Sequence, residues 1–152
     1  MAKEYFEEKP ENAGKFADGL VRTAKNMTGQ VLDYSPNSIT VLESIIDAMR
    51  RDGAPFHKMG DTIFCMGCYL GEVFVRNGHG KWAAKESSPM KDFSSSFLIK
   101  LSATAYCNPI DKVVKRIENG EEDSLTYFYK TWIAKADPAT TKKSFWKRLF
   151  GA

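Results

Sequence analysis

Cysteine and histidine are the residues of this chain with the most specific chemistry. Cys65 and Cys68 have the Cys-x-x-Cys spacing of a thiol redox pair and of half of a zinc site. A structural zinc site draws on a second compact pair of ligands, but His57, His79 and Cys107 are single residues scattered along the chain. Apolar residues at helical spacing precede Cys65, whereas a redox pair follows a strand at the start of a helix. We therefore interpret these thiols as packing residues of a helix and expect neither a metal nor a cofactor.

Glu72, His79 and Trp82 form a second group of candidate residues. Glu72 interrupts an otherwise apolar helical stripe one turn before Arg76, and glutamate ahead of arginine is the favourable order for an ion pair. His79 lies between two glycines beside Lys81 and Trp82, where an imidazole and an aromatic wall would suit a small acidic ligand. An ion pair and an ordinary turn explain the same residues. A ligand-binding or active site at this group is therefore the alternative interpretation.

The sequence contains none of the common catalytic motifs. There is no Gly-x-Ser-x-Gly elbow, no phosphate-binding glycine loop and no His-Glu-x-x-His segment. The acidic residues at 111, 118 and 121–123 could pair for acid–base chemistry, but the helix dipole and solubility explain carboxylates at exposed helix ends. We expect no catalytic residues, and the interpretation leans away from an enzyme.

The run from 142 to 150 is the most unusual local signal. It contains four basic residues, more than the net charge of +3 of the whole chain. On a helix its apolar residues would share one face, which suits insertion at a membrane surface or in the groove of a partner. The same face could instead pack on its own domain, and both alternatives stay open. Four charges release few counterions, so nucleic acid is an unfavourable partner. The residues of the run are Lys142, Lys143, Phe145, Trp146, Lys147, Arg148, Leu149 and Phe150, with Ser144 between them.

Length and composition limit the class of protein. The chain has 152 residues, of which 43% are apolar and 27% are charged, and these values suit one globular domain. With 22 basic and 19 acidic residues, the surface as a whole is not a polyanion-binding face. No apolar run approaches the ~18 residues that span a bilayer, and the opening segment is too acidic for a secretory signal. We expect a cytoplasmic protein with reduced thiols.

Apolar residues at three- and four-residue spacing predict five helices. Ser35-Pro36 and Asn108-Pro109 are typical helix starts, in which a polar side chain caps the helix and proline takes the first helical position. Residues 121–123 are all acidic and are predicted to open the last helix, because carboxylates stabilise the positive end of the dipole. The predicted helices cover residues 12–26, 36–52, 59–77, 109–119 and 121–137.

Three glycines, Gly60, Gly67 and Gly71, fall near one side of the predicted helix 59–77. Each costs up to ~1 kcal/mol relative to alanine in a helix interior, so a compensating interaction is needed. Close approach by a neighbouring element is the simplest compensation. We therefore expect this helix to be the most buried.

Short segments at 81–85, 97–102 and 103–107 have the composition of strands, and residues 30–34 are similar. Together with the helices they predict an α+β fold, with four or five helices around a small, mainly antiparallel sheet in a single domain. The domain is expected to cover residues 12–136. A flexible N-terminus at 1–11 would precede it, and a linker with the basic-aromatic tail would follow at 137–152.

Three segments of the chain resemble a family pattern. They are Gly-Cys-Tyr-Leu-Gly-Glu-Val at 67–73, Gly-His-Gly-Lys-Trp at 78–82, and the stretch from Asn108-Pro109-Ile110 to Glu121-Glu122-Asp123-Ser124-Leu125. Together they resemble an uncharacterised family of small bacterial α/β domains, over roughly residues 32–132. The resemblance implies a bacterial protein with a compact mixed fold. It supplies neither catalytic residues nor a ligand.

The dispersal of reactive side chains favours a binding protein over an enzyme. The leading hypothesis is a non-enzymatic bacterial protein-binding or inhibitory module of the toxin-neutralising type, by analogy of size and fold. Its expected partner is a protein of unknown identity. One alternative is a small-ligand-binding domain or enzyme with a site near Glu72, His79 and Trp82. The other is a peripheral membrane protein attached by the tail.

Overall fold

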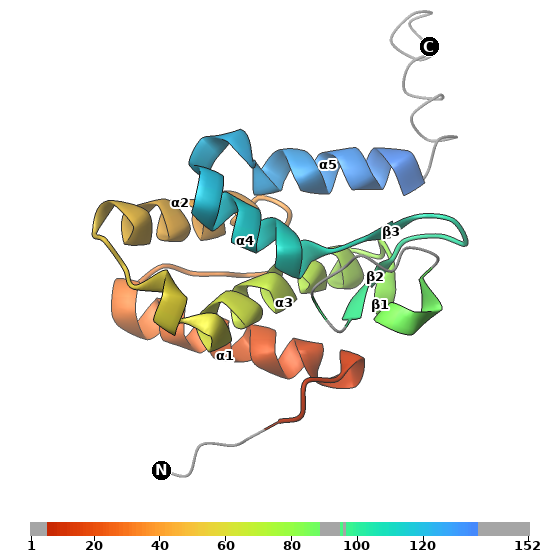
Figure 1. The fold of residues 1–152 in the computed structure, drawn as a ribbon, viewed down its shortest axis with the longest axis horizontal. Helices are drawn as coiled ribbons and strands as arrows, with labels where there is room; N and C mark the ends of the chain where they lie inside the picture. The colour runs from red at the N-terminus through yellow and green to blue at the C-terminus, as the bar shows by residue number, and fades with distance from the viewer. Residues whose placement is uncertain (1–5, 89–94, 96, 137–152) are drawn as a thin grey trace, which may run out of the picture.

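The computed structural model describes residues 6–88, 95 and 97–136. This part of the chain forms five α-helices and a three-stranded antiparallel sheet, so the predicted α+β single-domain fold is confirmed (Figure 1). The helices are α1 (Ala13–Thr28), α2 (Ser38–Arg51), α3 (Gly60–Arg76), α4 (Pro109–Asn119) and α5 (Leu125–Ala136). The strands are β1 (Lys81–Ala84), β2 (Phe97–Lys100) and β3 (Tyr106–Cys107).

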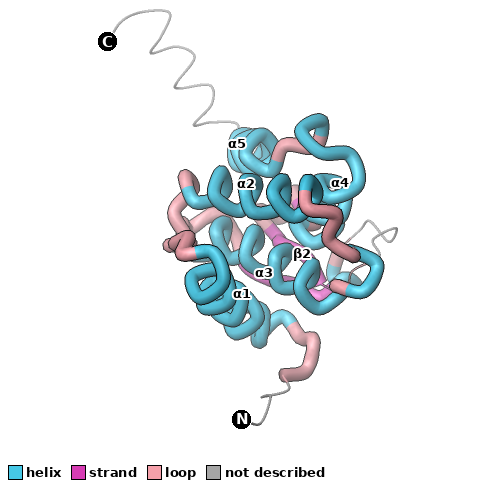
Figure 2. Tube along the Cα trace, turned by 90° about the vertical axis from the view of Figure 1, so that its left-hand side faces the viewer, coloured by secondary structure: helices cyan, strands magenta, loops and turns pink. Residues whose placement is uncertain are grey.

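Helix α3 is the central element of the fold. It lies between α1 on one side and α2 and α4 on the other, and α5 lies further out, next to α2 (Figure 2). Nine of its seventeen residues are buried, more than in any other described helix, which confirms the prediction from its apolar pattern. The side chains that gather round it, among them Leu20, Leu42, Ile46 and Val113, form one continuous core.

Two of the three α3 glycines allow the close contacts expected of them. A Cβ atom at Gly67 would lie 2.6 Å from the Cα of Ile110, so α4 packs directly on the α3 backbone. A Cβ atom at Gly71 would overlap the ring of Trp82 in β1. Gly60 is different, because its Cβ position has no neighbour within 4 Å. The helix therefore tolerates glycine at 67 and 71 because neighbouring elements fill the space.

The sheet is small and its strands are shorter than predicted. Strand β2 lies between the other two, with Ile99 opposite Trp82 on one side and Cys107 on the other. Residues 30–34 form no strand, contrary to expectation. The chain turns at Tyr34, whose φ of 64° is left-handed and whose N–H donates to the Tyr69 hydroxyl at 2.9 Å. Without a strand to pair with, β-type composition alone does not form a sheet.

Helices α2 and α4 begin near the local capping signals that were predicted for them. The Asn108 side chain accepts a hydrogen bond from the Asp111 N–H at 3.0 Å, and Ser35 Oγ accepts one from the Ser38 N–H at 3.2 Å. Helix α5, however, begins at Leu125 and not at 121. Residues 120–122 form a separate 3-10 turn, so the prediction that residues 121–123 open this helix is wrong. A carboxylate from a different helix takes that role, as described below.

Candidate functional site

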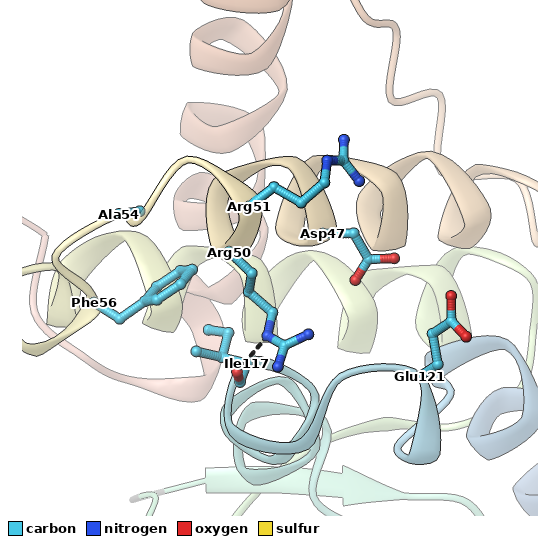
Figure 3. A pocket seen from close by; sticks show the side chains of 7 residues that line it. All are labelled: Asp47, Arg50, Arg51, Ala54, Phe56, Ile117 and Glu121. Carbon is cyan, nitrogen blue, oxygen red and sulfur yellow. Dashed lines mark hydrogen bonds between the residues drawn. The ribbon is translucent and has the colours of Figure 1, made fainter.

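An open hollow of about 600 Å³ lies between α2 and α4 (Figure 3). Its walls come from the second half of α2, the loop that follows it, the end of α4 and the turn Gly120–Glu122. No local pattern in the sequence marks this hollow, because its residues extend from Asp47 to Glu121 and belong to four elements. The lining residues are Asp47, Arg50, Arg51, Ala54, Phe56, Ile117 and Glu121.

Arg50 joins the two sides of the hollow. Its Nε donates a hydrogen bond to the carbonyl of Ile117 at 2.9 Å, drawn as a dashed line in Figure 3. Its guanidinium also occupies the space beside Gly120, where φ is +71° and a Cβ atom would collide with Nη1. Glycine at 120 therefore allows the left-handed turn at the end of α4, and it leaves room for the Arg50 guanidinium.

The opposite edge of the hollow carries groups that are available to a partner. Arg51 is exposed, and within the described residues its guanidinium has no hydrogen bond or ion pair. Phe56 and Ile117 are half-buried, so each presents apolar surface to the hollow. Arginine and aromatic residues are enriched at the energetically important positions of protein interfaces. The hollow is thus lined by an exposed cation and by two partly exposed apolar side chains.

Asp47, one of the lining residues, belongs to a buried ionic cluster between α2 and α4. The Arg116 side chain is only 5% exposed, and its guanidinium lies 2.8 Å from the Glu43 carboxylate and 2.7 Å from that of Asp47. Glu43 also accepts hydrogen bonds from the N–H groups of Leu125 and Thr126, each at 3.3 Å. Glu43 therefore supplies the negative charge at the start of α5 that the sequence analysis assigned to residues 121–123.

The hollow is lined by guanidinium, carboxylate and apolar groups. Among its described lining residues there is no serine, cysteine, histidine or lysine that could act as a nucleophile or as a base near neutral pH. Asp47 Oδ2 is paired with the Arg116 guanidinium at 2.7 Å. Guanidinium, carboxylate and apolar groups together suit recognition of a mixed polar and apolar surface.

Glu72 and Trp82, two of the three predicted ligand residues, are brought together by the structure. The Trp82 Nε1–H donates to Glu72 Oε2 at 3.0 Å, and the Arg76 Nε–H donates to Glu72 Oε1 at 3.2 Å. The predicted Glu72–Arg76 ion pair is therefore confirmed. Because Glu72 is 7% exposed and both oxygens accept hydrogen bonds from the protein, the carboxylate joins α3 to β1.

Arg76 extends this cluster to α1 and to the turn at Tyr34. Its guanidinium lies 3.6 Å from the Tyr34 ring centroid and 3.3 Å from Asp18 Oδ1. The Tyr34 hydroxyl donates to the same Asp18 oxygen at 2.5 Å, and its ring stacks on Tyr69. Burial, followed by the hydrogen bond to Asp18, raises the pKa of Tyr34 above its ordinary value. These contacts hold the left-handed Tyr34 in place and connect α1, α3 and the start of α2.

His79, the third predicted ligand residue, contacts a different part of the fold. The His79 ring lies edge-on to Tyr129 of α5, with centroids 6.2 Å apart. The backbone N–H of His79 donates to the Phe74 carbonyl at 2.9 Å. Phe74 also packs against Tyr129, and it follows Glu72 by two residues, which is a rotation of about 200° round a helix. The structure therefore places the His79 ring against α5 and the Glu72 carboxylate against β1.

The cysteines occupy packing positions. All three are free thiols: Cys65 is half-buried on α3, whereas Cys68 on the same helix and Cys107 in β3 are buried. Burial raises the pKa of each thiol above its ordinary value. Within the described ranges no group of three or more His, Cys, Asp or Glu residues could hold a metal ion.

We expect the buried thiols to react slowly. At pH 8, Cys68 and Cys107 should be alkylated by iodoacetamide about tenfold or more slowly than Cys65, because a raised pKa and burial reduce both thiolate and access. Peptide mass spectrometry over a time course measures the three rates separately. In urea the three rates should converge, and native rates that are already equal would contradict this placement.

Two observations concern the predicted contact with a membrane. The basic-aromatic run 142–150 lies outside the described residues, so its two interpretations stay predictions. Within the described part, none of the helices has the length and apolar character needed to span a bilayer.

Comparison with protein-family models, with curated proteins and with solved structures gave no match for this chain. The resemblance to small bacterial α/β domains therefore stays a prediction.

Proposed function

We propose that this chain is a non-enzymatic protein-binding module that contacts its partner through the hollow between α2 and α4. The observation that carries the proposal is a hollow lined both by the exposed Arg51, whose guanidinium has no partner in the described chain, and by the half-buried Phe56. Arginine and aromatic residues are enriched among the residues that contribute most to the binding energy of protein interfaces. The fitting partner is a protein surface with an apolar side chain for the hollow and a carboxylate for Arg51.

The candidate residues elsewhere support binding over catalysis. Glu72 has both carboxylate oxygens engaged, and Cys68 and Cys107 are buried thiols. His79 lies against Tyr129, on the α5 side of α3. A catalytic site needs such groups to converge in one cavity, and these groups belong to separate packing contacts.

The proposal places the chain among small bacterial cytoplasmic proteins that bind and inhibit another protein, such as a toxin. Size and fold class favour this by analogy, and the resemblance noted in the sequence is consistent with it. The run 142–150 would serve as an auxiliary contact, because basic and aromatic residues at one end of a chain add affinity once the main surface is bound.

The experiment compares variants of the hollow with a matched control. The tagged chain and the variants Arg51→Glu and Phe56→Ala are used to capture partners from the cells that produce the protein. Arg22→Glu is the control, because Arg22 is an exposed arginine on α1, away from the hollow. Binding of the captured protein is then measured with purified components by calorimetry. We expect Arg51→Glu and Phe56→Ala to weaken the Kd about tenfold or more.

The outcomes distinguish binding at the hollow from binding elsewhere on the surface. Arg22→Glu should bind like the unaltered chain, and deletion of 142–152 should weaken binding without abolishing it. Equal binding by all variants, equal weakening by Arg22→Glu, or capture of no protein by the unaltered chain would each contradict the proposal. Inhibition of the partner's activity in the purified complex tests the inhibitory class.

A further inference from the structure

Helix α5 is held differently from the helices that surround α3. Only two of its twelve residues, Leu125 and Tyr129, are buried, whereas Tyr127 is 72% exposed. Its inner face is a row of aromatic rings, in which Phe128 and Tyr129 contact the buried Phe74. The other helices interlock through continuous burial, but α5 lies against α2 and the end of α3 by one narrow face (Figures 1 and 2).

The start of α5 is held by a local cap, in which Ser124 Oγ accepts from the Tyr127 N–H at 3.1 Å, and by a carboxylate of another helix. Glu43 accepts from the N–H groups of Leu125 and Thr126 and from the Thr126 hydroxyl, the last at 2.5 Å. Immediately before the helix, Asp123 pairs with Lys112 of α4 at 2.7 Å, which fixes the preceding turn to the body of the protein. Lys112 therefore holds the turn to α4, while its Nζ also lies 5.8 Å from the Phe128 ring centroid of α5, and residues 123–124 lie where turn and helix meet.

The contacts of α2, α4 and α5 contain unsatisfied polar groups. Within the described chain, three buried side-chain atoms have no hydrogen-bond partner: Asp47 Oδ1 in α2, Arg116 Nε in α4 and the Tyr129 hydroxyl in α5. A buried polar atom without a partner favours any state in which water reaches it. Water reaches the hydroxyl of Tyr129 when α5 moves away from the helices on which it packs. Of these three atoms, the Tyr129 hydroxyl is the one that belongs to α5 itself.

We propose that α5 opens as a unit from a body formed by α1 to α4 and the sheet, with the hinge at residues 123–124 and Glu43 as the latch. In the open state Phe74, Phe128 and Tyr129 become accessible to solvent. Opening of α5 therefore exposes an aromatic surface that is covered in the closed state. Opening of a peripheral helix without global unfolding is a common form of sub-global fluctuation. This proposal does not depend on the function proposed above.

Hydrogen exchange of the full chain tests the proposal without a variant. Amides of residues 128–132 should exchange at least about tenfold faster, relative to their intrinsic rates, than amides of residues 66–74 in α3. Added urea should accelerate the α3 amides more steeply than the α5 amides, because local opening exposes less surface than global unfolding. Equal rates with equal urea dependence would overturn the proposal.

Two variants separate local opening from loss of global stability. Gly67→Ala weakens the α3–α4 contact within the body, so it should accelerate exchange in α3 and leave α5 unchanged. Thr126→Val removes a hydroxyl bond to the latch and should accelerate exchange in α5 about tenfold, whereas Thr131→Val, the same change on the same helix, should not. Acceleration of α5 by Gly67→Ala to the same extent as α3, or equal effects of the two threonine variants, would overturn the proposal.

Discussion

Replacing Arg116 by methionine is expected to lower the free energy of unfolding by about 3–5 kcal/mol, because it leaves two carboxylates beside an uncharged buried side chain. The guanidinium is 5% exposed and lies within 2.8 Å of Glu43 and 2.7 Å of Asp47. Methionine keeps much of the volume and the flexibility of the side chain, so the change is mainly loss of charge and hydrogen bonding. Urea unfolding followed by circular dichroism measures the difference.

The matched control is Arg51→Met, the same substitution at an exposed arginine. Arg51 has no ion pair within the described chain, so its replacement should change stability by no more than about 0.5 kcal/mol. Similar losses for the two variants would show that the Arg116 cluster contributes no more than a surface charge does. The control also confirms that hollow variants at Arg51 report on binding and not on folding.

Replacing Gly67 by alanine is expected to destabilise the fold by about 2–3 kcal/mol, the upper part of the usual range for overpacking. The added Cβ would lie 2.6 Å from both the Cα and the Cγ1 of Ile110. Side-chain rotation cannot move the Cα of Ile110 away from the added atom, so the whole of α4 must shift relative to α3. Thermal or urea unfolding measures the loss of stability.

Gly60→Ala provides the control on the same helix. Nothing lies within 4 Å of its Cβ position, so the substitution should be neutral or stabilise the protein by up to ~1 kcal/mol through helix propensity. If Gly67→Ala proves as harmless as Gly60→Ala, the close packing of α4 on α3 is wrong.

Local signals in the sequence were sufficient for much of the fold. The stripe of α3 predicted the most buried helix, and Asn108-Pro109 predicted the start of α4, because caps and turns depend on residues a few positions apart. The glycines at 67 and 71 indicated close contacts, although their neighbours Ile110 and Trp82 could not be named from spacing. The Glu72–Arg76 ion pair could also be predicted from the sequence, because its members are one helical turn apart.

The errors arose where distant residues decide the outcome. Residues 30–34 have strand-forming composition, but the chain turns at Tyr34 because Tyr69, Asp18 and Arg76 hold that residue. The start of α5 was placed too early because three acidic residues precede it, whereas Glu43 of α2 provides the charge. Neither contact leaves a local pattern in the sequence.

The amino-acid sequence by itself determined the α+β class, the order of the helices and most of their ends, since these depend on short-range hydrogen bonding and on the periodicity of apolar side chains. Only the tertiary structure decided which charges are paired and which are left free: Arg116 is enclosed by two carboxylates, while Arg51 faces the hollow. The physical reason is that pairing and exposure depend on how the helices pack together, and that packing brings together residues far apart in the chain.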